Sequence, residues 1–361
     1  MTSTCRRILS SLSASLCLGS VNVSLVLLAL AAQASAQSTF LSDVDVAPHS
    51  GAEGAAMPLQ VGSLLTAEQK KILSHMSIVQ LDDGLGGTCE AIRISGINLQ
   101  VVNGLGSTDT TNCLGNLIVG YNELGNPNGD DRSGSHNIVG GQKSSYSSHG
   151  GLLVGVRNTV SGAWASVSGG GDNTASGKGA SVSGGRDNIA SSLYSSVSGG
   201  RYNTATFEYS SVSGGMYNTA AGYGASVSGG GGNIASGIES SVSGGVFNTA
   251  SGVRASVSGG RYNIASGDHS SVSGGGFFLS AYGNTAYGAY SSVTGGANNT
   301  ASGEYASVSG GSTNVASGPY SSVSGGAVNT ADGNWASVSG GNFGSAPGTN
   351  DWVAGSLFED Y

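Results

Sequence analysis

Residues 166–177 read Ser-Val-Ser-Gly-Gly-Gly-Asp-Asn-Thr-Ala-Ser-Gly, and close copies of this stretch follow one another as far as residue 341. The valine returns every 15 residues, as in the step from Val167 to Val182, with one exception. Between Val272 and Val293 the step is 21, so one copy carries six extra residues. A fixed short period of this kind is typical of a solenoid, in which each repeat forms one coil and the coils stack.

We number the positions of each repeat as columns, counted from the valine as column 0. Column 8 is Ala in nearly every repeat, as at Ala175, and its even spacing from the valine predicts that both point into the core. Such a core is thin, so one coil alone buries too little apolar surface to offset the entropy of ordering it. Glycines in columns 2, 3 and 10, which are Gly169, Gly170 and Gly177 in the first full coil, are predicted to form the corners.

Column 6 is Asn through most of the array, as at Asn158 and Asn173. Asn tolerates the left-handed conformation at a corner, and identical amides one coil apart can hydrogen-bond along the stack. We therefore predict that this column is a structural ladder. The alternative is a row of ligand-binding amides.

The pattern Ser-Val-x-x-Gly-x-x-(Ser/Asn)-x-Ala-x-Gly resembles the head repeat of the trimeric autotransporter adhesins. Its matching positions are Val167, Gly170, Asn173, Ala175 and Gly177, together with their equivalents in later coils. Heads of that family are left-handed parallel β-rolls assembled as trimers. The resemblance implies an all-β fold, a left-handed parallel β-solenoid, in a homotrimer that takes part in adhesion, and the valine spacing sets its coils at 15 residues where the family usually has 14. The whole chain is also similar to uncharacterised secreted bacterial proteins with the same leader and repeat.

The first 36 residues have the features of a secretory signal peptide. Arg6 and Arg7 precede an apolar run through residues 25–32, and Ala34-Ser35-Ala36 forms a cleavage site before Gln37. We expect the mature chain to begin after Ala36 and to be secreted or held at the cell surface. No later stretch is long and apolar enough to span a bilayer as a helix, and none matches the membrane anchor of the adhesins, so we expect a head without a transmembrane anchor.

Charge and cysteine content limit the choice of partners. Removing the leader takes away two of the 13 basic residues and changes the formal charge from −8 to −10. With no basic stripe, the chain is not expected to bind nucleic acid. Cys89 and Cys113 are the two cysteines of the mature chain, and in an oxidising compartment they are candidates for a disulfide. The alternative is two small buried residues.

Composition and periodicity divide the chain into six segments. Residues 1–36 are the signal peptide, 37–62 a flexible arm, and 63–78 a short amphipathic helix with a capping box at Thr66 and Gln69. Residues 79–155 contain irregular first coils with bulkier apolar residues, as an N-terminal cap requires. The regular solenoid covers 156–341, and 342–361 forms a C-terminal cap. The helix is too short to stand alone in water, so it must pack on the solenoid or on copies of itself.

No catalytic or metal-binding arrangement is evident in the sequence. The histidines are scattered, no Gly-x-Ser-x-Gly motif occurs, and the acidic residues of the array form no clustered pair. We expect no enzyme, cofactor or metal. A carbohydrate-active β-helix enzyme is the alternative that this fold class allows.

Exposed aromatic residues recur in two columns and give the candidate binding surface. Stacked rings either brace neighbouring coils or a subunit interface, or form a stripe for glycans or for matrix and cell-surface proteins. The insertion adds a second apolar cluster, which is either a plug over a neighbouring coil or a contact for a partner. The candidates are Trp164, Tyr194, Tyr209, Tyr290, Tyr305, Tyr320 and Trp335 in column 12, and Phe277, Phe278 and Tyr282 in the insertion.

Column 7 is β-branched throughout, mostly Thr with Ile189, Ile234 and Ile264 among them. Its odd spacing from the valine predicts that it points outward. A regular file of this kind indicates either a subunit seam in a homo-oligomer or an ice-binding face, and the interspersed isoleucines favour the seam. The sequence therefore predicts a secreted, non-catalytic β-solenoid with a structural or adhesive role, with ice binding as the alternative.

Overall fold

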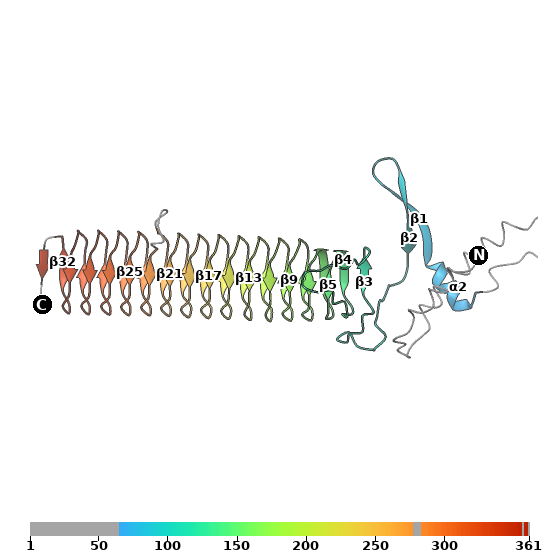
Figure 1. Ribbon diagram of the computed structural model, residues 1–361, viewed down its shortest axis with the longest axis horizontal. Coiled ribbons are helices and arrows are strands. Elements are labelled where there is room, and N and C mark those ends of the chain that lie inside the picture. Colours follow the sequence, from blue (N-terminus) through green and yellow to red (C-terminus); the bar gives the residue numbers. More distant parts are fainter. Residues whose placement is uncertain (1–64, 277–282, 356, 360–361) are drawn as a thin grey trace, which may run out of the picture. The chain divides into compact units, whose positions relative to one another are not determined.

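The computed structural model describes residues 65–276, 283–355 and 357–359, and it divides the chain into two units, Met1–Ile97 and Asn98–Tyr361. The second unit is a parallel β-solenoid with one 15-residue coil after another (Figure 1). In a regular coil, columns 14 and 0 form a short strand in one sheet, and columns 7 and 8 form a short strand in the other. The predicted all-β solenoid with one short N-terminal helix is therefore confirmed.

Each sheet is built by pairing a residue with its equivalent in the next coil. Val167 pairs with Val182 in the first sheet, and Ala175 pairs with Ala190 in the second. The order of strands in the first sheet is β3 (Leu117–Val119), β4 (Ile138–Gln142), β6 (Leu152–Val156), β8 (Ser166–Val167), β10 (Ser181–Val182), β12 (Ser196–Val197), β14 (Ser211–Val212), β16 (Ser226–Val227), β18 (Ser241–Val242), β20 (Ser256–Val257), β22 (Ser271–Val272), β24 (Ser292–Val293), β26 (Ser307–Val308), β28 (Ser322–Val323), β30 (Ser337–Val338), β32 (Trp352–Ala354) and β33 (Leu357–Glu359).

The second sheet has 14 strands, one from each coil that reaches it. In order along the stack they are β5 (Ser145–Tyr146), β7 (Thr159–Val160), β9 (Thr174–Ala175), β11 (Ile189–Ala190), β13 (Thr204–Ala205), β15 (Thr219–Ala220), β17 (Ile234–Ala235), β19 (Thr249–Ala250), β21 (Ile264–Ala265), β23 (Thr285–Ala286), β25 (Thr300–Ala301), β27 (Val315–Ala316), β29 (Thr330–Ala331) and β31 (Ser345–Ala346).

The six-residue insertion leaves the register of the stack unchanged. Val272 pairs with Val293, and Ala265 pairs with Ala286, as regular neighbours do. The side-chain oxygen of Asn263 likewise accepts the backbone N–H of Asn284 at 2.9 Å. The 15-residue frame therefore resumes at Asn284. Residues 277–282, which include Phe277, Phe278 and Tyr282, lie outside the described residues.

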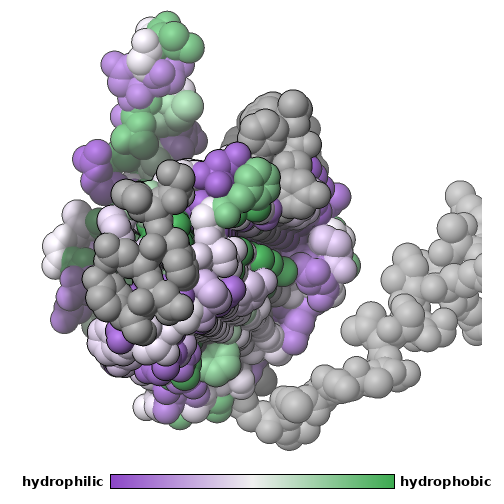
Figure 2. All heavy atoms as spheres, turned by 90° about the vertical axis from the view of Figure 1, so that its left-hand side faces the viewer, coloured by the Kyte–Doolittle hydropathy of each residue, from purple (hydrophilic) through white to green (hydrophobic). Residues whose placement is uncertain are grey.

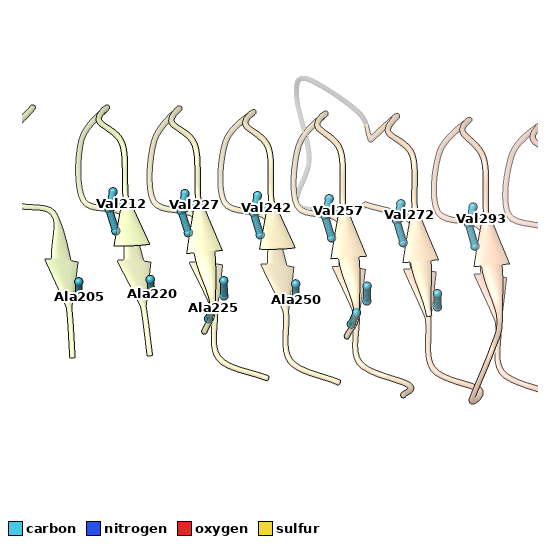
Figure 3. Close-up of a cluster of buried hydrophobic side chains, with 14 of the residues drawn as sticks. Ala205, Val212, Ala220, Ala225, Val227, Val242, Ala250, Val257, Val272 and Val293 are labelled. Atoms are coloured by element: carbon cyan, nitrogen blue, oxygen red, sulfur yellow. The ribbon is translucent and has the colours of Figure 1, made fainter. Parts of the chain in front are cut away.

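The interior consists of one valine and one alanine from each coil, as the even spacing predicted. Val227 is 1% exposed and Ala220 is fully buried, and Figure 3 shows the two files running side by side along the stack. A third file was not predicted: column 13 alternates between Ala and Ser, and both residue types are buried there, as at Ala225 and Ser240. Because no inward-facing column of the regular coils holds anything larger than Val, the interior is filled by small side chains.

The Asn column is a buried hydrogen-bonded ladder, which confirms its structural role. The side-chain oxygen of Asn203 accepts the backbone N–H of Asn218 at 3.0 Å, and the Asn218 amide nitrogen donates to the carbonyls of Gly214 and Gly230. Each Asn therefore bonds to the coil before it through its backbone N–H, and to its own corner and the coil after it through its side-chain amide. The predicted left-handed residue is not Asn218 itself but Tyr217 beside it, with φ of 57°.

Two of the three glycine columns are required by the packing. A Cβ on Gly215, in column 3, would lie 2.1 Å from the carbonyl oxygen of Gly230, and its φ is +85°. In column 10, a Cβ on Gly237 would lie 2.0 Å from the carbonyl oxygen of Gly252. Column 2 differs from the prediction, because a Cβ on Gly214 would meet no atom within 4 Å. The corners are thus formed by columns 3 and 10.

Both ends of the solenoid depart from the regular coil. Near the N-terminal end, Tyr146, Leu153 and Val160 fill the interior in place of smaller residues, as predicted for the first coils. At the C-terminal end β33 turns back and pairs antiparallel with β32, so it covers the edge of the first sheet. Gly344 takes the place of Asn in column 6, and its N–H donates the last ladder bond to the side-chain oxygen of Asn329.

The first unit is described from residue 65 and contains a helix and a hairpin. Helix α2 (Ala67–Ser74) begins at the predicted capping box of Thr66 and Gln69. Strands β1 (Met76–Asp82) and β2 (Thr88–Ile94) pair antiparallel. The helix is shorter than the predicted 63–78, because Met76-Ser-Ile-Val alternates in period two and joins the hairpin. The hairpin itself was not predicted, and it occupies the segment assigned to the first coils.

No residue of the first unit is buried among residues 65–97. Of the helical residues that the structure describes, none belongs to a segment with the length and apolarity of a membrane span.

Candidate binding surface

The aromatic residues of column 12 occupy the turn that leads into each strand of the first sheet. All of them have the left-handed backbone conformation, with φ of 60° at Tyr290, 57° at Tyr305 and 62° at Trp335. Aromatic residues are unusual there, since their Cβ meets the following carbonyl oxygen. The sequence does contain a signal for this conformation, because Gly179 and Gly224 occupy the same column in other coils.

Five rings in successive coils form one continuous stack, which we call the aromatic ladder: His269, Tyr290, Tyr305, Tyr320 and Trp335. The ring centroids are 4.8 Å apart from His269 to Tyr290 and from Tyr290 to Tyr305, and 4.9 Å apart from Tyr305 to Tyr320. Trp335 lies 4.1 Å from Tyr320. Interplanar angles of 1–7° show that the rings are parallel. The predicted bracing of coils by stacked rings is present here.

The ladder covers the faces of its rings and leaves their edges open. Tyr305 and Tyr320 are each 44% exposed although both of their faces meet another ring. A sugar that stacks on an aromatic side chain needs a free ring face, which the internal rings do not offer. The accessible parts are ring edges and, on three residues, phenol hydroxyl groups. The pKa of the Tyr305 phenol is raised by desolvation and by its neighbours Tyr290 and Tyr320, so it keeps its proton in mildly basic solution.

The other column-12 candidates form separate, smaller groups. Tyr194 and Tyr209 stack with centroids 5.7 Å apart, and Tyr223, which was not predicted, meets Tyr209 edge-on at 5.5 Å. Trp164 meets the edge of His149 and carries the Lys178 ammonium 4.7 Å from its centroid. The candidate residues are therefore divided among three places along the solenoid.

A second corner holds the aromatic residues of column 5 in two pairs. Tyr202 and Tyr217 stack at 4.8 Å, and Phe247 and Tyr262 stack at 5.2 Å. The guanidinium of Arg201 lies 4.7 Å from the Tyr202 ring centroid. At this corner the rings stack only in pairs and a guanidinium lies over one of them. The aromatic ladder, by contrast, is a stack of five rings.

The charged residues near these corners are held by neighbouring groups. Arg157 forms a bidentate ion pair with Asp172 at 2.6 and 2.8 Å, which lowers the pKa of that carboxyl, and Arg254 pairs with Glu239 at 2.7 Å. In the loop that precedes the first regular coils, Asp130 accepts the N–H groups of Asn126 and Gly125, and these bonds lower its pKa. Across the described ranges, no three acidic, histidine or cysteine side chains gather as metal ligands would.

Residues of the segment 100–108 line a depression in the described surface beside His136. One ring nitrogen of His136 accepts the N–H of Asn103 at 3.2 Å, and the other lies 3.1 Å from the carbonyl oxygen of Thr108. Both nitrogens therefore hold the loop, and neither is free to act as a base or a ligand.

The column-7 candidates point outward, as their parity predicted. Ile189 and Ile234 are 40% and 41% exposed, and Ile264 is half-buried. Cys89 lies in the hairpin unit and Cys113 in the solenoid unit, both as exposed free thiols, so their pairing remains a prediction. A scan against models of protein families finds no match to the chain, and a search of curated proteins also finds none.

Proposed function

We propose that the mature chain is a secreted, non-catalytic β-solenoid with a structural or adhesive role in attachment to cells or matrix. The observation that carries this proposal is the form of the second unit. Its interior is filled by Val and Ala, while aromatic side chains project from its corners in stacked files. Such a solenoid presents the same groups at each coil, as extended binding surfaces of solenoid proteins do. The signal peptide before Ala36 supports secretion.

The state of the charged groups supports a non-catalytic role. Catalytic acids and bases are usually found with perturbed pKa values in a cleft, free to reach a substrate. Here the carboxyls with lowered pKa, such as Asp172 and Asp130, are the ones that bind a guanidinium or backbone N–H groups. This arrangement favours an adhesive solenoid over the alternative of a carbohydrate-active enzyme.

The partner class follows from the geometry of the aromatic ladder. Because the faces of the internal rings Tyr290, Tyr305 and Tyr320 are covered, a glycan could bind these rings only through their edges and hydroxyl groups. Matrix or cell-surface proteins, which can pack against ring edges and accept hydrogen bonds from phenols, are the better match. We therefore favour a protein partner over a glycan.

Self-association is proposed through the first unit. Ile78 and Ile92 are directly paired across the hairpin, yet they are 74% and 68% exposed, and Ile72 on the helix is 58% exposed. A two-stranded hairpin with no buried residue is marginally stable in water, so its order calls for a partner surface. We propose that this surface is another copy of the chain, in a homo-oligomer and, by analogy with the adhesins, a trimer.

Light scattering on residues 37–361 would test the assembly. We expect an oligomer whose mass falls to that of a monomer when Ile78 and Ile92 are both changed to Lys. The matched comparison is a variant in which Ile189, Ile234 and Ile264 of column 7 are changed to Lys. If those three disperse the oligomer and the hairpin variant does not, the seam lies on column 7 and the hairpin proposal is wrong.

Attachment would be measured with the same purified chain on immobilised cells, matrix proteins and a glycan array. We expect saturable binding to cells or matrix proteins that Tyr290→Asn and Tyr305→Asn weaken together. Asn is chosen because it tolerates the left-handed backbone. Failure to bind any of the three surfaces would contradict the adhesive role.

Ice binding stands as a second candidate because column 7 forms a flat, in-register file. Thr204 pairs with Thr219 on neighbouring strands, and Thr249 and Thr285 continue the file on either side of Ile264. Parallel strands place such residues at about 4.8 Å intervals, a regular array that could order water. Thermal hysteresis of the purified chain, lost on changing Thr204 and Thr219 to Lys, would favour this function over attachment.

A further inference from the structure

The aromatic ladder lies in a part of the chain with a distinct charge. Residues 262–361 contain no Lys and no Arg, and their acidic residues are Asp268, Glu304, Asp332, Asp351, Glu359 and Asp360. By contrast, the stacked pair Tyr202–Tyr217 has Arg201 over one ring. The longest stack of rings in the described solenoid thus lies in a segment without Lys or Arg.

Three of these carboxyl groups belong to coils of the ladder. Asp268 and Glu304 each directly precede a ladder residue, His269 and Tyr305, and Asp332 lies three residues before Trp335. Glu304 is exposed, and its charge contributes to raising the pKa of Tyr305. A ligand that lies along the ladder would therefore meet negative charge at several coils.

The exposed ring edges decide which ligand would fit. The exposed parts of these rings are C–H edges and phenol oxygens, and a flat molecule can lie across them in van der Waals contact. The parallel rings present their edges as one strip, with steps of 4.1–4.9 Å between centroids. A flat aromatic molecule laid along this strip would make the same edge-to-face contact at several coils.

We propose that the aromatic ladder is a binding site for extended, planar, cationic aromatic molecules, which lie along His269, Tyr290, Tyr305, Tyr320 and Trp335. Ring edges and phenol oxygens contact the flat side of the ligand, and the carboxylates of Glu304 and its neighbours attract and balance its positive charge. The rings are already held in place by stacking, so little side-chain entropy is lost on binding. The inference is independent of the attachment role, because a solenoid that touches no cell would still bind such a molecule.

Fluorescence titration with thioflavin T, a planar aromatic cation, would test the site on residues 37–361. We expect saturable binding to the wild-type chain that weakens as salt is raised, since salt screens the carboxylates. Tyr305→Asn interrupts the ladder and should weaken binding at least tenfold. Tyr202→Asn with Tyr217→Asn, at the corner that carries Arg201, is the matched control and should leave the affinity unchanged. Anionic anilinonaphthalene sulfonate should not compete for the site.

Energy transfer gives a second measurement that does not depend on a variant's stability. Emission of Trp335, identified by its loss in Trp335→Phe, should be quenched as thioflavin T binds the wild-type chain. The proposal is overturned if thioflavin T does not bind, if it binds without quenching Trp335, or if a folded Tyr305→Asn chain binds as tightly as wild type. Equal loss in the Tyr202 and Tyr217 control would also overturn it, because binding would then not be specific to the ladder.

Discussion

The two units of this chain obtain their order in different ways. In the solenoid, each coil buries one Val and one Ala and places one Asn amide against the coils on either side. In the first unit, helix and hairpin form their own hydrogen bonds, but residues 65–97 include none that is buried. Figure 2, which looks along the second unit from its C-terminal end, shows successive coils receding in rows of matching residues. In the solenoid, the stacking of repeated coils buries apolar surface. The helix and hairpin of the first unit bury no residue of their own.

The largest expected effect is from a charge in the solenoid core. Val227→Asp would place an unpaired carboxylate where the native side chain is 1% exposed, which costs several kcal/mol or forces local unfolding. Ile78→Asp changes a similar residue that is 74% exposed in the hairpin. We expect circular dichroism melting to show loss of the cooperative solenoid transition in the first variant and an unchanged transition in the second. Equal effects would remove the difference between the units.

The Asn ladder gives the next effect. Asn218→Ala removes the acceptor of the Asn233 N–H and the donor to two glycine carbonyls, and each buried group left unpaired costs about 1–3 kcal/mol. The matched variant Asn334→Ala changes an exposed amide of the same array. Urea unfolding should show a clear loss of stability for the first and less than about 0.5 kcal/mol for the second.

Adjacent glycines provide a comparison within one corner. Gly215→Ala adds a methyl group 2.1 Å from a carbonyl oxygen at a positive φ, a conformation that costs a non-glycine residue about 1–3 kcal/mol before the clash is counted. Gly214→Ala adds the same group in open space. The melting temperature should fall markedly in the first variant alone. Similar melting temperatures in the two variants would mean that neighbouring coils can move apart at this corner without a loss of stability.

The smallest effect is expected at the helix cap. Thr66→Ala removes the bond that the Thr66 hydroxyl accepts from the Gln69 N–H, and N-cap losses of this kind cost about 1 kcal/mol. Hydrogen exchange should become faster in residues 67–74 and stay unchanged in the solenoid. A shift in the melting of the solenoid would show that the two units unfold together.

The period of the sequence was sufficient to predict the coil, the register of the regular coils and the Val and Ala files of the core, but not the buried file in column 13. Val and Ala recur at an even spacing within a fixed period, so both residues face inward in every coil. Assigning the inward face once therefore assigns it for all regular coils. The insertion before Asn284 was placed correctly for the same reason, because the frame on either side determines it. The hairpin over residues 76–94 was missed, since it occurs once and no repeat supports it.

The site depended on tertiary structure to a larger extent. The sequence could place Tyr290, Tyr305, Tyr320 and Trp335 in one exposed column, but not decide whether their faces are open or covered. That is determined by the distance between coils, because strands at β-sheet spacing bring rings of equivalent residues to 4.1–4.9 Å and favour parallel stacking. The left-handed turn that carries them is likewise imposed by the corner and not by the aromatic residue. The sequence by itself therefore determined which side chains recur and at what period, while the stacking of coils decided which surfaces of those side chains remain free to bind.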